Sequence, residues 1–404
     1  MTPKVTRRYI FAIFLLAFIV RVAYALVTPP FQAPDEYSHY SYVKFLHTFR
    51  HLPVQPDPAI NAEELELHQP PLYYVLAATL FPSANFVAGR PLLPMRFINI
   101  LFSMLTLGIV YYFASTVFPK NPFAVALMCT GVALLPTYSY LSATIRNGVL
   151  ATFFASLGFH LCAKAVLDHE RQADARWSWI GVVAGLAMLS KLSSIGFVAA
   201  AGLLLLATSP NWRTSLHRAT WFGLGVTSTA GWWFFRNWSV YGHWMKVIEN
   251  GDGYVPPAVS WAHEKQSAIT LFKTFWAVFG RINEFHFADI YRVYWWFAGI
   301  ALLGIILYFV QRRHDIPRQL AGFFALAIGL SLAATLYYAH TYNSDQGRYM
   351  FPTLIPIMTF VAIGLSTLFP PRYHRVVLDT VLFAFAGINV VVLARLAAIY
   401  WQIG

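Results

Sequence analysis

Residues 9–40 read YIFAIFLLAFIVRVAYALVTPPFQAPDEYSHY, an apolar run followed at once by a proline-marked polar segment. Residues 9–27 are long enough to cross a bilayer, because a helix of about 20 residues spans its roughly 30 Å hydrocarbon core. Comparable runs recur as far as Tyr400, and only 11% of the 404 residues are charged, against about 25% in soluble domains. The sequence therefore predicts an all-α polytopic membrane protein.

The positions of the basic residues predict its orientation. A net charge of +12 could indicate a nucleic-acid partner, but short gaps between the apolar runs hold many of the cations, as clusters that mark cytoplasmic loops. These cations are Lys4, Arg7, Arg8, Lys120, Lys164, Arg171, Arg176, Arg213, Arg218, Arg312, Arg313, Arg318, Arg372 and Arg375. We therefore expect a cytoplasmic N-terminus in the inner membrane, contacts with membrane lipids and no nucleic-acid partner.

The apolar runs divide the chain into eleven expected spans within one domain, residues 1–404. The spans are 9–27, 94–117, 122–141, 147–167, 178–190, 193–208, 219–240, 290–310, 319–338, 350–369 and 376–399. Residues 72–81 are apolar but too few to cross, so we expect them to lie at or re-enter the outer interface. Residues 28–93 then form a long outer loop with juxtamembrane helices, and residues 241–289 form a second outer segment. Residues 1–27 also resemble a signal peptide, but we favour an uncleaved first helix.

The first candidate motif is Pro34-Asp35-Glu36-Tyr37-Ser38-His39-Tyr40. A proline followed by two acids is a favourable helix start, which is the simplest interpretation. Alternatively, a carboxylate that is partly desolvated at the membrane boundary has a raised proton affinity and can act as a general base. Because adjacent acids cannot share a helix face, one would face a substrate while the other orients or caps.

The second motif is His68-Gln69-Pro70-Pro71-Leu72-Tyr73-Tyr74. On its own it is typical of a proline-stiffened entry to an interfacial helix, with the two tyrosines in an aromatic belt. Beside the acidic motif, it becomes a second candidate part of a site.

A third feature is a set of cations where spans meet the outer face. These are Arg146, Lys191, Arg236, Arg281 and Arg348. Any one of them could extend its side chain to the interface, since burying an unpaired charge is unfavourable. Five on one side with few acids beyond the first loop favour an anionic ligand such as a lipid phosphate.

Metal and cofactor sites have weak support. Glu36, His39, His47 and His51 could share one helix, and the last two have the spacing of zinc ligands, but a third matching ligand is missing. The sequence has no Gly-rich phosphate loop or dinucleotide motif. Cys129 and Cys162 lie within apolar runs and are expected in the core. We therefore expect no metal and no cofactor.

The motifs together resemble the GT-C superfamily of membrane glycosyltransferases, similar to the aminoarabinose transferase and protein mannosyltransferase families. Besides the two motifs above, the matching segments are Gly185–Lys191, Trp233–Asn237 with Tyr241-Gly242, Phe275–Gly280 and Gln346–Pro352. The resemblance implies a GT-C fold. In one place the chain departs from the pattern, because Asn147 is followed by Gly148 rather than an acid.

The resemblance implies an inverting enzyme that moves a sugar from a polyprenyl-phosphate carrier to an acceptor hydroxyl on the outer face. It implies Asp35 as the general base and Glu36 as a second catalytic acid, with Arg146, Lys191, Arg236 and Arg348 holding the donor phosphate. The expected substrate-binding residues are His39, His68, Tyr73, Arg281, Glu284 and Tyr349. We expect a monomer.

Two other functions stay open at this stage. A glycan ligase that uses a polyprenyl-diphosphate oligosaccharide would need similar arginines but not Asp35. A lipid or glycolipid transporter should instead show inverted repeats, broken helices and ionisable residues deep in the membrane. The sequence shows no repeat and few charges within the spans, which favours the transferase.

Overall fold

The computed structural model describes residues 3–54, 68–81, 92–168, 173–245, 261–281, 285, 287–313, 315–342 and 344–403. Across these residues the regular elements are helices, apart from one isolated bridge between Phe279 and Phe285. The predicted all-α class is therefore confirmed.

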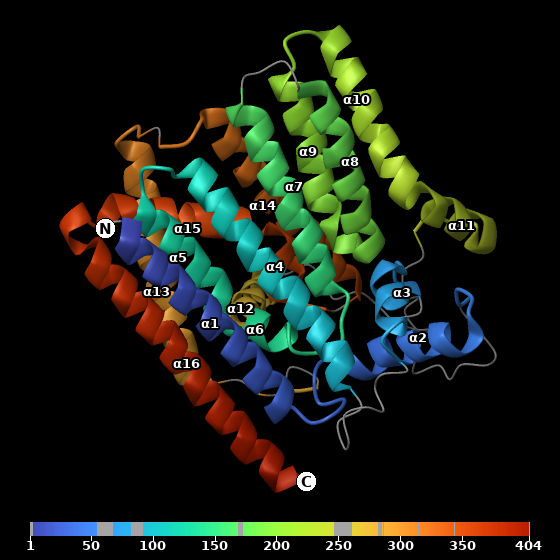
Figure 1. The fold of residues 1–404 in the computed structure, drawn as a ribbon, viewed down its shortest axis with the longest axis horizontal. Helices are drawn as coiled ribbons and strands as arrows, with labels where there is room; N and C mark the ends of the chain where they lie inside the picture. The colour runs from blue at the N-terminus through green and yellow to red at the C-terminus, as the bar shows by residue number, and fades with distance from the viewer. Residues whose placement is uncertain are drawn as a thin grey trace.

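Seven segments of the described chain are helical, long and apolar enough to cross a membrane. They correspond to α1 (Pro3–Val27), α4 (Leu93–Val117), α7 (Gly148–Leu167), α13 (Ala288–Val310), α14 (Arg318–Tyr342), η5 with α15 (Gly347–Thr353 and Leu354–Leu368), and η6 with α16 (Pro371–Tyr373 and His374–Ile403). Figure 1 shows these helices packed into one bundle, with α1 and α16 side by side along one edge.

The predicted count of eleven spans is not confirmed. The other four predicted spans fall on shorter or more polar helices. These are α5 (Pro122–Leu134) with α6 (Pro136–Leu141), α8 (Ala173–Ser190), η3 with α9 (Leu192–Ser194 and Ile195–Thr208), and α10 (Trp212–Val226) with the π turn η4 (Thr227–Gly231) and α11 (Trp232–Tyr241).

Local chemistry sets several helix ends. The side chain of Asn121 accepts a hydrogen bond from the Ala124 amide at the start of α5, and Asn211 does the same for Thr214 at the start of α10. Such caps satisfy amides that have no partner within the helix. Gly242 ends α11 with a φ of 72°, a backbone angle that glycine adopts without strain.

The predicted span 122–141 is broken inside the bundle. Leu135 is extended and Pro136 starts a new helix, α6, because proline disfavours a helical conformation in the residue before it and cannot donate a hydrogen bond. The carbonyls left at the end of α5 are bonded by buried side chains: Arg21 Nη1 lies 2.8 Å from the Ala133 oxygen, and Asn389 Nδ2 lies 2.9 Å from that of Leu134. Capping of this kind is needed where water is excluded.

The first loop contributes two helices at one end of the bundle. In Figure 1, α2 (Glu36–Phe49) lies across the end of α4, and α3 (Leu72–Ala78) packs beside it. With seven residues α3 is too short to cross, in agreement with the expectation for residues 72–81. Tyr73 and Tyr74 are fully buried, so they belong to the core between α2 and α3 and not to an aromatic belt.

Candidate active site

A small cavity lies where four helical elements meet at the end of the bundle that carries α2. It is bordered by Tyr138, Leu141, Arg146, Gly148, Val149, Lys191, Ser193, Arg348, Phe351 and Pro352. Three of the predicted phosphate-binding cations therefore converge, although they are far apart in sequence. The cavity lies at the N-terminus of α7, opposite the end that carries Lys164 and the Arg176–Asp168 ion pair.

Asp35 lies beside this cavity and pairs with two of its arginines. Its Oδ2 is 2.6 Å from Arg348 Nη2 and 3.7 Å from Arg146 Nη2. The Asp35 side chain is 37% exposed, whereas those of the two arginines are 7% and 4% exposed. Residue 35 has a φ of 59° and does not cap α2 with its side chain, so the simple helix-start interpretation does not describe this carboxylate. Aspartate tolerates the left-handed backbone conformation better than most residues.

The charge state of Asp35 differs from the prediction. Burial raises the pKa of its carboxyl, but Arg348 and Arg146 outweigh this effect, so the pKa lies well below its ordinary value. The predicted raised proton affinity is therefore wrong for the site as the two arginines shape it. Asp35 is an ionised and weakly basic carboxylate there.

Arg348 has more donors than the protein uses. Its Nη2 bonds Asp35, but Nε and Nη1 are buried and have no hydrogen-bond partner among the described residues. The position of Arg348 is fixed by the preceding residue, Gly347, whose amide donates a hydrogen bond to Thr274 Oγ1 at 2.6 Å. A Cβ on Gly347 would lie 2.1 Å from the Leu271 carbonyl oxygen, so this close approach requires glycine. Unsatisfied buried donors are unfavourable, and an anion would satisfy them.

Two more features favour an anion in the cavity. The first turn of α7, at Gly148 and Val149, borders it, and helix N-termini present free amides and a positive dipole. Lys191 follows α8 with an extended backbone, and its Nζ lies 5.6 Å from the centre of the Tyr349 ring. Tyr349 also lies beside Arg348, at 5.8 Å.

Glu36 is placed very differently from Asp35. It is fully buried, and its oxygens accept from Arg96 Nε at 2.8 Å and Arg96 Nη2 at 2.7 Å. The amides of Ile145 and Phe31 donate to the same carboxylate, each at 3.1 Å. A carboxylate occupied by four donors has no capacity left for a substrate. The expectation of direct catalysis by Glu36 is therefore corrected to a structural role, and the alternative that one acid orients fits it.

Arg96 is a central residue that the sequence reasoning missed. Besides Glu36, it donates to the carbonyl oxygens of Ala25, Thr28 and Pro29 at 2.7–3.1 Å. It ties the end of α1 and the start of α2 to α4. A signal was present, because a lone arginine in an apolar span is usually paired.

Two predicted substrate-binding residues instead support residues 144–147, the turn that carries Arg146 and is called the arginine turn below. The Tyr73 hydroxyl accepts from the Arg146 amide at 3.0 Å and from Asn99 Nδ2 at 3.2 Å. Since Tyr73 is fully buried and its hydroxyl is used, it positions Arg146 rather than contacting substrate. His39 is buried and bonds the Tyr74 hydroxyl through Nδ1 at 2.8 Å. Burial and the nearby Arg146 place the pKa of His39 well below its ordinary value.

The remaining predicted residues divide between the cavity surroundings and other places. His68 is buried, and the adjacent Gln69 accepts from Asn147 Nδ2 at 3.2 Å, which links this motif to the arginine turn. Arg236 lies elsewhere: its Nη2 donates to the Pro53 carbonyl oxygen at 2.5 Å and its guanidinium lies 5.0 Å from the Trp233 ring centre. Arg236 therefore does not border the cavity that holds Arg146, Lys191 and Arg348, contrary to the prediction that the four act together.

Arg281 is exposed and does not border the cavity, so its predicted contact with substrate is not supported. Glu284 lies outside the described residues.

The weak metal candidate at α2 is not assembled. Glu36 is bonded to Arg96, His39 to Tyr74, and His47 stacks on Phe81 at 4.7 Å between ring centres. In the described chain, these residues do not form a close group of three ligands. Cys129 and Cys162 are both buried and unbonded, as predicted.

Comparisons with known proteins agree with this architecture. Residues 68–233 match the family described as dolichyl-phosphate-mannose-protein mannosyltransferase. No curated protein sequence matches the chain.

Similar folds occur among solved structures, and three of them are each 14% identical to this chain. Apo ArnT from Cupriavidus metallidurans has a TM-score of 0.57 over 89% of this chain and 60% of ArnT. ArnT bound to undecaprenyl phosphate has a TM-score of 0.56 over 95% and 73% of the two chains. The oligosaccharyltransferase AglB from Archaeoglobus fulgidus, in complex with an inhibitory peptide and a dolichol-phosphate, has 0.51 over 98% and 55%. The chain covers 60%, 73% and 55% of the lengths of these three chains. The predicted resemblance to GT-C glycosyltransferases is confirmed at the level of the fold.

Proposed function

We propose that this chain, a multi-pass membrane protein of the GT-C glycosyltransferase type, transfers a sugar from a polyprenyl-phosphate carrier to an acceptor hydroxyl with inversion. The ArnT structure with undecaprenyl phosphate supports a lipid-phosphate donor for a protein of this fold. Arg146, Lys191, Arg348 and the first turn of α7 would hold the donor phosphate. Asp35 would act as the general base.

The observation that carries this proposal is the incomplete pairing of Arg348. In the part of the chain that the structure describes, two of its nitrogens are buried without an acceptor, while the third is bonded to the partly exposed carboxylate of Asp35. A phosphate oxygen in the cavity would supply the missing acceptors, as charge-assisted hydrogen bonds to a guanidinium are among the stronger ones in proteins.

Donor binding would also prepare the base. A phosphate that shares Arg348 and Arg146 brings negative charge close to Asp35, and like charge raises the pKa of a carboxyl. Asp35 would thus gain proton affinity when a donor is present. This resolves the contrast between the lowered pKa that the two arginines give Asp35 and its proposed task.

The reaction then needs no further group on the protein. Asp35 accepts the proton of the acceptor hydroxyl while the acceptor oxygen bonds the anomeric carbon. The bond from that carbon to the phosphate oxygen breaks on the opposite face, and its electron pair stays on the phosphate. The three cations stabilise this developing charge.

The proposed site lies on the outer side of the inner membrane. Support comes from the position of the cavity at one end of α7, while the basic gap with Lys164 and Arg176 lies at the other. Basic gaps of this kind mark the cytoplasmic side. Labelling of single cysteines at positions 75 and 120 from outside tests the orientation: position 75 should react, and position 120 should not.

The function is tested with purified protein in lipid, radiolabelled polyprenyl-phosphate sugars and a set of hydroxyl acceptors. Asp35→Asn should lower transfer by about 10²–10⁴-fold, since it removes a general base. The same variant should still bind polyprenyl phosphate, because Arg348 is retained. Full transfer by Asp35→Asn would contradict the proposal, and transfer only from diphosphate-linked oligosaccharides would indicate a glycan ligase.

A further inference from the structure

One face of α12 (Trp261–Trp276) is fitted to the segment that carries Arg348. Along α12, Glu264, Ser267, Leu271 and Thr274 recur every three or four positions, so they share one face of the helix. His263, four positions before Ser267, lies at the edge of this face. Opposite them lie the end of α14 and the start of η5.

Two contacts already fix the middle and the far end of this face. Ser267 Oγ donates to Asp345 Oδ2 at 2.8 Å, and Thr274 Oγ1 accepts from the Gly347 amide at 2.6 Å. Ser344 and Tyr349 bond each other at 2.9 Å between hydroxyl oxygens. Residues 344–349 are therefore held on α12 beside the donor cavity.

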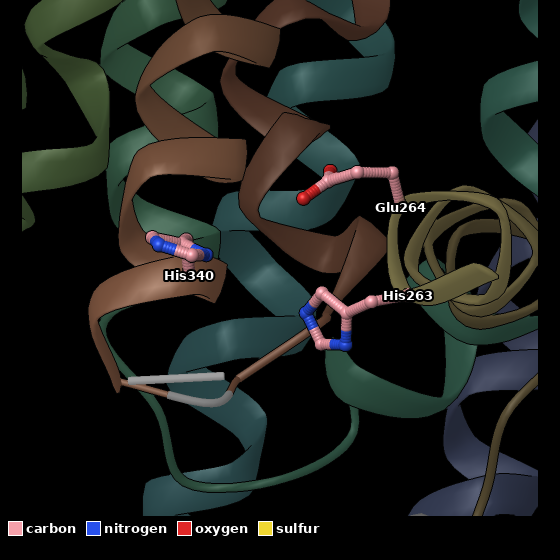
Figure 2. Close-up of side chains that lie close together, drawn as sticks. All are labelled: His263, Glu264 and His340. Carbon is pink, nitrogen blue, oxygen red and sulfur yellow. The ribbon is translucent and has the colours of Figure 1, made fainter. Parts of the chain in front are cut away.

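The third contact, at the start of α12, has a different chemistry. Figure 2 shows His263 and Glu264 projecting from α12 toward His340 on α14. One ligand atom from each residue lies within 4.8 Å of the other two, and all three residues are half-buried. The Nδ1 atom of His340 is buried and has no hydrogen-bond partner within the described part of the chain. A buried imidazole nitrogen without a hydrogen-bond partner is uncommon in proteins, and a bound metal ion is one group that can satisfy it.

We infer that His263, Glu264 and His340 form a binding site for a divalent transition-metal ion, with Zn²⁺ as the preferred ion. Two imidazoles and one carboxylate are a common zinc donor set, with a fourth position left to water or another oxygen. Ligand atoms around a tetrahedral zinc ion lie roughly 3.3 Å apart, given bonds of about 2.0–2.1 Å. Small side-chain rotations would bring the three ligand atoms to that spacing.

The ion would act as a clamp between two helices and would not take part in sugar transfer. It would join the first turn of α12 to the last turn of α14, just before the segment that carries Arg348. Together with the contacts of Ser267 and Thr274, it would fix that segment at three points. The site is separate from the donor cavity, whose lining includes none of the three ligands.

Metal binding by the full chain, purified in detergent and stripped with EDTA, tests this inference without any assay of transfer. Zn²⁺ is titrated against a chromophoric chelator, with Mg²⁺ in a parallel titration. We expect roughly one tightly bound Zn²⁺ per chain and no comparable binding of Mg²⁺. Zn²⁺ should also raise the Tm of the wild-type protein, since it binds the folded state.

Glu264→Gln and His340→Gln keep nearly the volume of the original side chains and remove one ligand each. Each should weaken Zn²⁺ binding by at least about 100-fold. Substitution of a residue that only hydrogen-bonds to a metal ligand already lowers metal affinity by about 10–100-fold, and loss of a ligand should cost more. Each should also abolish the Zn²⁺-dependent rise in Tm. His217→Gln, on the exposed face of α10, is the matched control and should behave as wild type.

Co²⁺ gives a second measurement that does not depend on thermal unfolding. It should produce visible absorption in the wild type and in His217→Gln, but not in His340→Gln. Equal Zn²⁺ affinity in the wild type and both ligand variants would overturn the inference, because the ion would then bind elsewhere. Absence of tight Zn²⁺ binding by the wild type would overturn it as well.

Discussion

Two consecutive acids, Asp35 and Glu36, each meet a buried arginine, yet the two pairs are built differently. Glu36 and Arg96 are bonded to each other and to the surrounding backbone. The carboxylate accepts four hydrogen bonds, and the guanidinium also donates to three carbonyl oxygens. Asp35 and Arg348 share one short contact, and two nitrogens of Arg348 find no acceptor among the residues that the structure describes.

The difference teaches how a membrane protein separates support from binding. A buried ion pair with all its hydrogen bonds made has no reason to change when a ligand arrives. A pair with donors left over is unfavourable alone and gains when an anion enters. Glu36–Arg96 therefore holds the first loop on the bundle, while Asp35–Arg348 keeps donors available for the proposed phosphate.

The strongest effect should come from breaking the supporting pair. Arg96→Met leaves the carboxylate of Glu36 buried and without its main partner, which costs about 3–5 kcal/mol of folding free energy. Denaturant unfolding in detergent measures this loss. The double variant Glu36→Leu with Arg96→Met should recover much of it, because no unpaired charge remains. Equal instability of the single and double variants would contradict the assigned role.

The next largest effect should come from the binding pair. Arg348→Met removes donors that, in the proposed reaction, stabilise the leaving phosphate, so transfer should fall by about 10²–10³-fold. Affinity for polyprenyl phosphate should fall too, while the free energy of unfolding changes little compared with Arg96→Met. The outcome that would contradict the comparison is a large loss of stability with normal transfer.

A smaller effect is expected at Tyr73. Tyr73→Phe leaves the buried Arg146 amide without its acceptor at 3.0 Å, at a cost of about 1–3 kcal/mol. Transfer should fall mildly, because Arg146 is still present but less well held. Tyr112→Phe, at an exposed position, should leave both stability and transfer unchanged.

The ion pair of Asp35 should also show itself in the pH dependence of stability. Burial raises the pKa of Asp35, but the arginines outweigh it and lower the pKa. A carboxyl whose pKa is lowered by folding stabilises the fold at pH values above its pKa in the unfolded chain, about 3.9. This contribution is lost as the pH falls below that value toward the lower pKa of the folded state. The Tm difference between wild type and Asp35→Asn should therefore be constant near neutral pH and shrink below about pH 4. A difference that instead shrinks as the pH rises would have the wrong sign.

The smallest effect is expected at Arg236, which lies outside the cavity. Arg236→Lys keeps the positive charge but loses the stacking on Trp233, so transfer and donor affinity should change by less than about threefold. A loss comparable to that of Arg348→Met would place the donor phosphate near α11 instead.

Much of the fold followed from the chain's periodic apolar runs and its basic gaps. The broken helix at Leu135–Pro136 was missed because the run 122–141 is uniformly apolar, and the side chains that cap the break, Arg21 and Asn389, lie far away in sequence. Hydropathy registers length and polarity, and it carries no information on which distant side chain satisfies a carbonyl.

The candidate site was only partly predictable. The cations Arg146, Lys191 and Arg348 could be grouped because each lies where a span ends. Nothing local distinguished them from Arg236, whose partners are Pro53 and Trp233. The roles of Asp35 and Glu36 depend on which arginine each one meets, and the lowered pKa of Asp35 follows from that tertiary contact.

The most direct test is a structure of the protein in lipid with polyprenyl phosphate bound. We expect the phosphate between Arg146, Lys191 and Arg348, with an oxygen about 3 Å from Nε or Nη1 of Arg348 and the Glu36–Arg96 pair unchanged. A headgroup beside Arg236 or Arg281, with the contact between Asp35 Oδ2 and Arg348 Nη2 unchanged, would contradict this placement of the donor phosphate.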